Sequence, residues 1–210
     1  MLFNSFEFAL FLPIVFLLYW FVFKKNLRVQ NLFLIIASYL FYGWWDWRFL
    51  SLIFISSLVD YQVGIGLGKT DEPRKRKLLL YLSLLVNLGL LGTFKYFNFF
   101  VDSFIDLFSN FGLTLTARRL NVILPVGISF YTFQTLSYSI DVYRRKLQPT
   151  RDVFAFFAFV SFFPQLVAGP IERATNLLPQ FYKKREFEYP QAVDGLRQIL
   201  WGLLKKNSYC

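Results

Sequence analysis

The chain has 210 residues, of which 56% are hydrophobic and 21% aromatic, and its formal net charge is +10. So large an apolar fraction excludes an ordinary soluble domain and indicates an integral membrane protein. The basic residues stand in short loops between apolar runs, which is typical of membrane topology signals, so we expect no nucleic acid partner. A single cysteine excludes an intrachain disulfide and a Cys-based metal site.

Six apolar runs are candidates for helices at membrane depth, since about 20 apolar residues cross a bilayer. The first run is long, lacks a following cleavage site and is preceded by no Lys or Arg, which predicts a retained anchor rather than a signal peptide. The runs cover residues 6–23, 32–45, 49–67, 78–97, 122–140 and 153–168. They predict one membrane domain over residues 1–210, all-α, with about five transmembrane helices.

The charges of the loops predict an orientation. Clusters of Lys and Arg follow the first, third and fifth runs, whereas Arg48 alone separates the second from the third. The positive-inside rule then predicts an N-terminus outside and the basic loops in the cytoplasm. Arg118 and Arg119 would lie outside, and they do not outweigh three strongly basic loops.

Two segments are expected at the outer interface. The tryptophans of GWWDW (residues 43–47) have an apolar ring and a polar N–H, which favour the headgroup zone. In NFFVDSFIDLFSNFG (residues 98–112), Phe and Leu recur at helical spacing while Asp102 and Asp106 lie elsewhere on the wheel. This pattern predicts an interfacial helix that lies in the membrane plane.

The fifth run carries a polar face. Alternating steps of four and three residues place five side chains on one side of a helix: Gly127, Tyr131, Gln134, Tyr138 and Asp141. Polar groups at membrane depth are costly unless they face a partner or water, so this face should look into the protein or into a hydrated cavity. Two readings stay open, namely hydrogen bonding between helices and the wall of a substrate passage. Asp141 and Arg144 are expected to form a local ion pair.

Helix breakers interrupt the sixth run at SFFPQLVAGPIERA (residues 161–174). Pro164 should kink the helix, and Gly169–Pro170 should end it. If the basic residues 183–185 are cytoplasmic, the run enters and leaves on the same side. Broken backbone at membrane depth is tolerated only inside protein or beside a hydrated cavity. We therefore predict a re-entrant segment with Gln165 near its tip, with a kinked sixth span as the alternative.

The stretches LPVGISFYTFQTLSYSIDVYRRK and FFAFVSFFPQLVAGPIERATNLLPQF, together with the opening LFNSFEFALFLPIVFLLYW, resemble the membrane-bound O-acyltransferase family. The likeness is to its bacterial polysaccharide-modifying branch. It implies the N-terminal half of a multi-helix fold in the bacterial inner membrane, whose helices wall a tunnel. There an acyl donor, acetyl-CoA or an acyl carrier, would meet a hydroxyl of an extracellular polysaccharide such as alginate. A periplasmic or extracellular acetylation partner is also implied.

The resemblance points to particular site residues. The positions that match the two motif blocks, or share the polar face with them, are Gln134, Tyr138, Asp141, Arg144, Gln165, Gly169, Pro170 and Arg173. By this resemblance Gln134 and Gln165 would line or shape the tunnel. Arg144 and Arg173 would stabilise its cytoplasmic mouth or attract an anionic donor. A purely structural role is equally open for each.

The family's catalytic residue is a membrane-embedded histidine, which can take a proton from a hydroxyl near neutral pH. This sequence contains no histidine. We therefore expect an N-terminal portion that is inactive alone, and we assign no catalytic residue, no bound cofactor and no metal site. The alternative is a non-catalytic membrane scaffold or acyl-group conduit that docks a separate transferase.

Overall fold

The computed structural model describes residues 3, 5–110, 127–169 and 172–208. Over these residues every regular element is helical and no strand occurs, which confirms the predicted all-α class. The part of the fifth run before Gly127 and the site candidate Pro170 lie outside the described residues.

The helices follow the predicted apolar runs in order. The first half consists of α1 (Phe6–Leu17) with its π-helical continuation η1 (Leu18–Val22), α2 (Leu27–Gly43), α3 (Arg48–Lys69), α4 (Pro73–Leu91) with the π-helical η2 (Gly92–Tyr96), and α5 (Phe97–Asn110). The second half consists of α6 (Ile128–Tyr143), α7 (Val153–Ser161), α8 (Phe163–Ala168), α9 (Ala174–Leu177), the 3-10 turn η3 (Leu178–Phe181) and α10 (Tyr189–Ser208).

Capping residues set where several helices begin. The side chains of Ser5, Asn26 and Asp152 accept backbone hydrogen bonds in the first turns of α1, α2 and α7. Pro73 opens α4, where its missing N–H removes no helical hydrogen bond. The cap at Asn26 explains why α2 starts ahead of the predicted apolar run, which began at residue 32.

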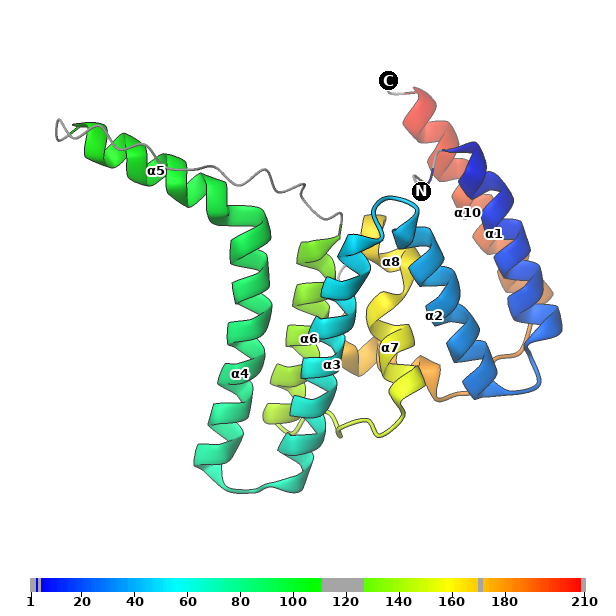
Figure 1. The fold of residues 1–210 in the computed structure, drawn as a ribbon. Coiled ribbons are helices and arrows are strands. Elements are labelled where there is room, and N and C mark those ends of the chain that lie inside the picture. The colour runs from blue at the N-terminus through cyan, green and yellow to red at the C-terminus, as the bar shows by residue number, and fades with distance from the viewer. Residues whose placement is uncertain (1–2, 4, 111–126, 170–171, 209–210) are drawn as a thin grey trace.

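Helix α6 is the centre of the bundle. It packs against α3, α4, α7 and α9, while α2 packs against α3, α7 and α8 (Figure 1). α5 projects away from the end of α4, as expected of a segment that does not belong to the bundle (Figure 1). The interior is rich in buried aromatic side chains, among them Phe41, Phe156 and Phe159.

Two stretches of helix, Arg48–Lys69 and Pro73–Ser109, are long and apolar enough to cross a membrane. Three shorter apolar helices cover Phe6–Val22, Leu27–Gly43 and Val153–Leu166. Large apolar side chains stand exposed on the outer faces of α1, α3 and α4, where a bilayer would cover them. The count of five spans stays a prediction.

Residues 151–181, which contain the segment predicted to be re-entrant, begin and end at the same end of the bundle and are called the hairpin. Tyr61 in the second half of α3 donates to the Arg151 carbonyl just before α7, and Asn31 near the start of α2 donates to the Phe181 carbonyl at the end of η3. Since α2 and α3 are antiparallel, both ends of the hairpin lie at one end of the bundle (Figure 1). The chain therefore passes through α7 and α8 and comes back to the end of the bundle from which it started. Its depth in a membrane stays a prediction.

The break in this hairpin does not fall where Pro164 was expected to kink the helix. Phe162, with φ −55° and ψ 101°, separates α7 from α8, and Pro164 stands in the first turn of α8. A proline there removes no helical hydrogen bond, so it starts a helix instead of bending one. Gly169 ends α8 with an extended backbone, as predicted.

Candidate functional site

The polar face predicted on α6 is buried in the bundle. Gln134, Tyr138 and Asp141 are only 1%, 0% and 8% exposed. The face therefore looks into the protein, which is one of the two surroundings expected of it. Because neighbours surround α6 on several sides, its polar side chains point to different helices and not into a single space.

Gln134 and Gln165, the two glutamines expected to shape a tunnel, lie together. The Gln134 side-chain amide donates to the Phe159 carbonyl at 2.7 Å and lies 3.4 Å from the side-chain oxygen of Gln165. Phe159 is close to the end of α7, where a helix leaves carbonyls without intrahelical partners. Gln134 thus links α6 to the break between α7 and α8. At this break the backbone of the hairpin is not helical.

Tyr138 holds the loop that leads into α7. Its hydroxyl accepts a hydrogen bond from the Thr150 backbone amide at 3.1 Å, and its ring packs on Phe156 with centroids 4.8 Å apart. A Cβ at Gly64 would collide with the Tyr138 hydroxyl, so the glycine permits α3 and α6 to approach closely. Tyr138 is therefore a packing and orienting residue.

The expected ion pair between Asp141 and Arg144 does not form. Asp141 lies on the buried side of α6, and its Oδ2 has no hydrogen-bond partner among the described residues. Arg144 is the exposed C-cap residue of the same helix. α6 ends where the interior of the bundle meets the surface. The Asp141 side chain therefore faces the interior, whereas the Arg144 side chain is exposed.

The remaining candidates lie on the return path of the hairpin. Gly169 ends α8, and a Cβ there would lie 2.7 Å from the Gln165 Cα, which favours glycine at this point. Arg173 is exposed and precedes α9, where its carbonyl accepts from Asn176 and Leu177. Gly169 is thus beside the glutamine pair, whereas Arg173 faces outward.

A buried carboxylate that the sequence analysis missed joins three helices. Asp60 of α3 accepts hydrogen bonds from Ser83, from Ser139 at 2.8 Å and from Asn87 at 2.6 Å. Asn87 in turn accepts from Ser56 at 2.7 Å and from Thr135 at 3.1 Å. Asp60, Ser83, Asn87 and Ser139 have no exposed surface.

The signal for this cluster is a repeated spacing. Each helix supplies two small polar residues four positions apart: Ser56 and Asp60 from α3, Ser83 and Asn87 from α4, and Thr135 and Ser139 from α6. Residues four apart share a helical face, so three such pairs within apolar runs indicate three facing helices. A buried carboxylate with this many donors fixes the relative positions of the three helices.

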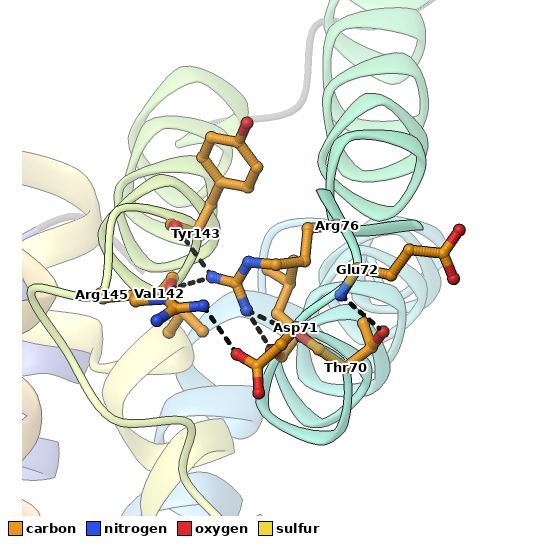
Figure 2. Close-up of polar contacts among 8 residues, drawn as sticks. Thr70, Asp71, Glu72, Arg76, Val142, Tyr143 and Arg145 are labelled. Atoms are coloured by element: carbon orange, nitrogen blue, oxygen red, sulfur yellow. Dashed lines mark hydrogen bonds and ion pairs between the residues drawn. The ribbon is translucent and has the colours of Figure 1, made fainter. Parts of the chain in front are cut away.

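At the basic end of the bundle, a buried arginine joins the C-terminal ends of α3 and α6 (Figure 2). Arg76 of α4 donates to the carbonyls of Leu67 and Thr70 on one side. On the other side it donates to Val142 at 3.2 Å and to Tyr143 at 2.8 Å. These carbonyls lie in the last turns of α3 and α6 or directly after them, where the negative end of each helix dipole favours a cation.

A surface ion pair lies beside Arg76. Figure 2 shows Arg145, just after α6, meeting Asp71 of the loop between α3 and α4, with an N–O distance of 2.6 Å. Both side chains are largely exposed, so the pair contributes little to stability. Arg145 itself has a left-handed backbone with φ 60°, a conformation that usually belongs to glycine.

The described residues bring together no cluster of His, Cys, Asp or Glu that would hold a metal ion. The site as a whole is an interior of neutral and acidic polar side chains arranged around α6, with arginines at one end. Such an interior can orient helices and present amide groups beside irregular backbone.

Comparison with known proteins shows that the chain is similar to acetylases of alginate and peptidoglycan. A probable alginate O-acetylase AlgI from Pseudomonas putida is 41% identical over 210 residues, which cover 98% of this chain and 42% of that protein. The corresponding protein of Pseudomonas aeruginosa is 39% identical, with 98% and 39% covered. A peptidoglycan O-acetyltransferase from Helicobacter pylori is 34% identical over 236 residues, with 98% and 44% covered. The chain spans about two fifths of the length of these curated relatives. No family model matches it, and no solved structure matches it significantly.

Proposed function

Because the chain belongs to the membrane-bound O-acyltransferase family, we propose that it is part of a membrane enzyme that acetylates an extracellular polysaccharide. The similarity to acetylases of alginate and peptidoglycan over 98% of the chain carries this proposal. The buried polar face of α6 supports it, since a membrane helix retains such groups for helix contacts or a polar passage.

The proposed reaction moves an acetyl group from a donor to a hydroxyl of the acceptor. The bond from the acetyl carbon to its donor breaks, an ester bond to the acceptor oxygen forms, and the hydroxyl proton passes to a base. With acetyl-CoA or an acyl carrier as donor, the group that leaves is a thiol. An alginate-like polymer and a periplasmic acetylation partner are the acceptor and partner that we propose.

These residues would then form the frame of the acetyl passage. Gln134 and Gln165 would present amide groups at the irregular backbone between α7 and α8, and the Asp60 cluster would hold α6 in place. No residue here is assigned the role of base, since none of the 210 is a histidine. We therefore expect no acetyl transfer by this chain alone.

A chimera tests the function directly. The aligned region of the Pseudomonas putida relative is replaced by these 210 residues, and acetyl esters are measured on the alginate secreted by cells that lack their own acetylase. We expect acetylation above the level of cells without the chimera. The 210-residue chain alone, at equal membrane abundance, should leave the alginate unacetylated.

A chimera that reaches normal abundance in the membrane but adds no acetyl ester would contradict the proposal. If the 210-residue chain then co-purified with a separate transferase, the scaffold function would be favoured instead. Acetylation by the 210-residue chain alone would refute the dependence on a histidine.

We also propose the multi-pass orientation derived from the basic loops, with the N-terminus outside the bacterial inner membrane. Asp46 and Glu72 lie in the loops at opposite ends of α3. In a background with Cys210→Ser, the Asp46→Cys variant should react with an impermeant maleimide added outside the inner membrane. The Glu72→Cys variant should react only after the membrane is opened, and the reverse pattern would invert the orientation.

A further inference from the structure

A cavity of about 590 Å³ lies between the end of η1 and the segment that precedes α10. It is distinct from the polar interior around α6. One part of its lining is cationic and consists of Lys24, Lys25, Lys184 and Arg185. Glu186 is the one acidic residue of the lining. The other part is aromatic: Trp20, Phe21 and Phe187.

Arg185 is held rigidly at this cavity. Its guanidinium donates to the Tyr19 hydroxyl at 2.6 Å, to the Asn31 side-chain oxygen at 2.9 Å and to the Gln180 carbonyl at 3.3 Å. The Gln30 side-chain oxygen lies 3.5 Å away. All of these acceptors are neutral, so the hydrogen bonds orient the guanidinium without cancelling its charge.

The positive charge of the cavity is only weakly compensated. Within the described part of the chain Arg185 forms no ion pair, and Lys184 has one at 3.8 Å with Glu186. Both members of that pair are 77% exposed, where such contacts are weak. A fixed arginine surrounded by lysines with few carboxylates is the arrangement that binds phosphate groups.

The aromatic part of the cavity favours a ligand that has an apolar component. Phe187 packs edge-on against Trp20 and Phe16, with ring centroids 5.6 and 6.0 Å apart. Phe21, which also lines the cavity, is 55% exposed. The π-helical turn η1 carries both Trp20 and Phe21, and π-helical turns are frequent at functional sites.

An exposed apolar stripe on α1 and η1 runs away from the cavity. Leu10, Ile14, Leu17 and Phe21 recur at helical spacing, and each is more than half exposed. Phe21 belongs to both features, so the cationic cavity and the apolar stripe are continuous. A ligand that matches them has a phosphate at one end and hydrocarbon chains at the other.

We propose that this cavity binds the headgroup phosphate of an anionic phospholipid, whose acyl chains lie along the exposed stripe of α1. Basic pockets beside membrane helices on the cytoplasmic side recognise anionic headgroups in this way. A soluble phosphate ester has no chain to cover the stripe, so it should bind more weakly. The proposal uses the membrane orientation given above but not acetyl transfer, and its test measures binding alone.

The test is a lipid titration of the full 210-residue chain in detergent micelles, followed by native mass spectrometry at matched detergent concentration. Phosphatidylglycerol is the probe, phosphatidylcholine is the uncharged lipid control, and coenzyme A is the soluble phosphate ester. The variant Lys24→Gln/Lys25→Gln removes two exposed cations from the cavity and leaves Arg185 in place. The control Lys69→Gln/Lys146→Gln removes two exposed cations from the same end of the bundle outside the cavity.

We expect phosphatidylglycerol to bind more tightly than either other ligand, and its affinity to fall about tenfold in the cavity variant, which is about 1.4 kcal/mol. The control variant should bind as the parent does. Circular dichroism must show equal helix content in the three proteins. An equal loss in both variants would mean general charge attraction and would overturn the proposal. Equal binding of phosphatidylcholine, or preferred binding of coenzyme A, would overturn it too.

Discussion

The side-chain amide of Gln134 in α6 lies 3.4 Å from the side-chain oxygen of Gln165 in α8, and the same amide donates to the Phe159 carbonyl at 2.7 Å. Both glutamines are almost completely buried. One residue thus connects the central helix to both arms of the broken helix. The backbone leaves helical geometry at Phe162, three residues after the carbonyl that Gln134 contacts.

We predict that Gln134→Leu lowers the free energy of unfolding by about 1–3 kcal/mol, because it leaves the buried Phe159 carbonyl unpaired. The measurement is unfolding in sodium dodecyl sulfate, followed by circular dichroism. Gln62→Leu is the matched control, since Gln62 is exposed on α3 and should change stability by less than about 0.5 kcal/mol. Equal effects of the two variants would show that Gln134 does not fasten the hairpin.

The second prediction concerns Asp60 and uses an exchange of the side chains at positions 60 and 87. Asp60→Leu removes the acceptor for Ser83, Asn87 and Ser139 and should destabilise the protein by at least about 3 kcal/mol. Asp60→Asn should cost less, but its amide would face the Asn87 amide donor-to-donor. The double variant Asp60→Asn/Asn87→Asp restores a donor and an acceptor between the two positions.

The exchanged protein should therefore be more stable than Asp60→Asn alone. A double-mutant cycle with the single variants measures this coupling, which we expect at about 0.5–3 kcal/mol. If the double variant is as unstable as the sum of the singles, the hydrogen bond between the two positions does not stabilise the packing of α3 on α4.

Much of the helical order was predictable from the sequence, because it depends on local properties. Apolar runs located α1, α3 and α4, and Gly169 ended α8 as expected. The break at Phe162 was not predictable in detail, since a proline can either bend a helix or begin one. The choice depends on tertiary contacts, such as that of Gln134 with Phe159.

The sequence predicted the candidate site only for residues that belong to one and the same helix. Periodicity brought Gln134, Tyr138 and Asp141 to one face, and the structure buries all three. Asp60 was missed because its partners come from α4 and α6, and the shared spacing of four residues is evident only when the three helices are compared. The prediction of an ion pair between Asp141 and Arg144 was wrong, because spacing along a helix does not tell where the helix reaches the surface.

Arg76 supports a third prediction. Arg76→Gln should lower the free energy of unfolding by about 3 kcal/mol, because the carbonyls at the ends of α3 and α6 lose charge-assisted hydrogen bonds. Lys75→Gln, next to it on α4, is the control: its pair with Glu72 is exposed and contributes at most about 1 kcal/mol. Both variants remove one positive charge, so equal losses of stability would mean that net charge, and not the buried contacts, is responsible.

Arg145 leads to a stabilising prediction. The helix α6 ends in a Schellman motif, in which Lys146 N donates to the Asp141 carbonyl and Arg145 N to the Val142 carbonyl. Arg145 takes the left-handed position with φ 60°, which costs a residue with a Cβ about 1 kcal/mol.

Arg145→Gly should therefore raise the free energy of unfolding by up to about 1 kcal/mol, although it removes the ion pair with Asp71. Asp71→Asn removes that pair without changing the backbone, so it gives the contribution of the pair alone. Arg144→Gly is the opposite control, because its φ of −75° is helical and glycine there should destabilise the protein. If Arg145→Gly is instead less stable than Asp71→Asn, the side chain of Arg145 stabilises the end of α6 by more than the left-handed backbone costs.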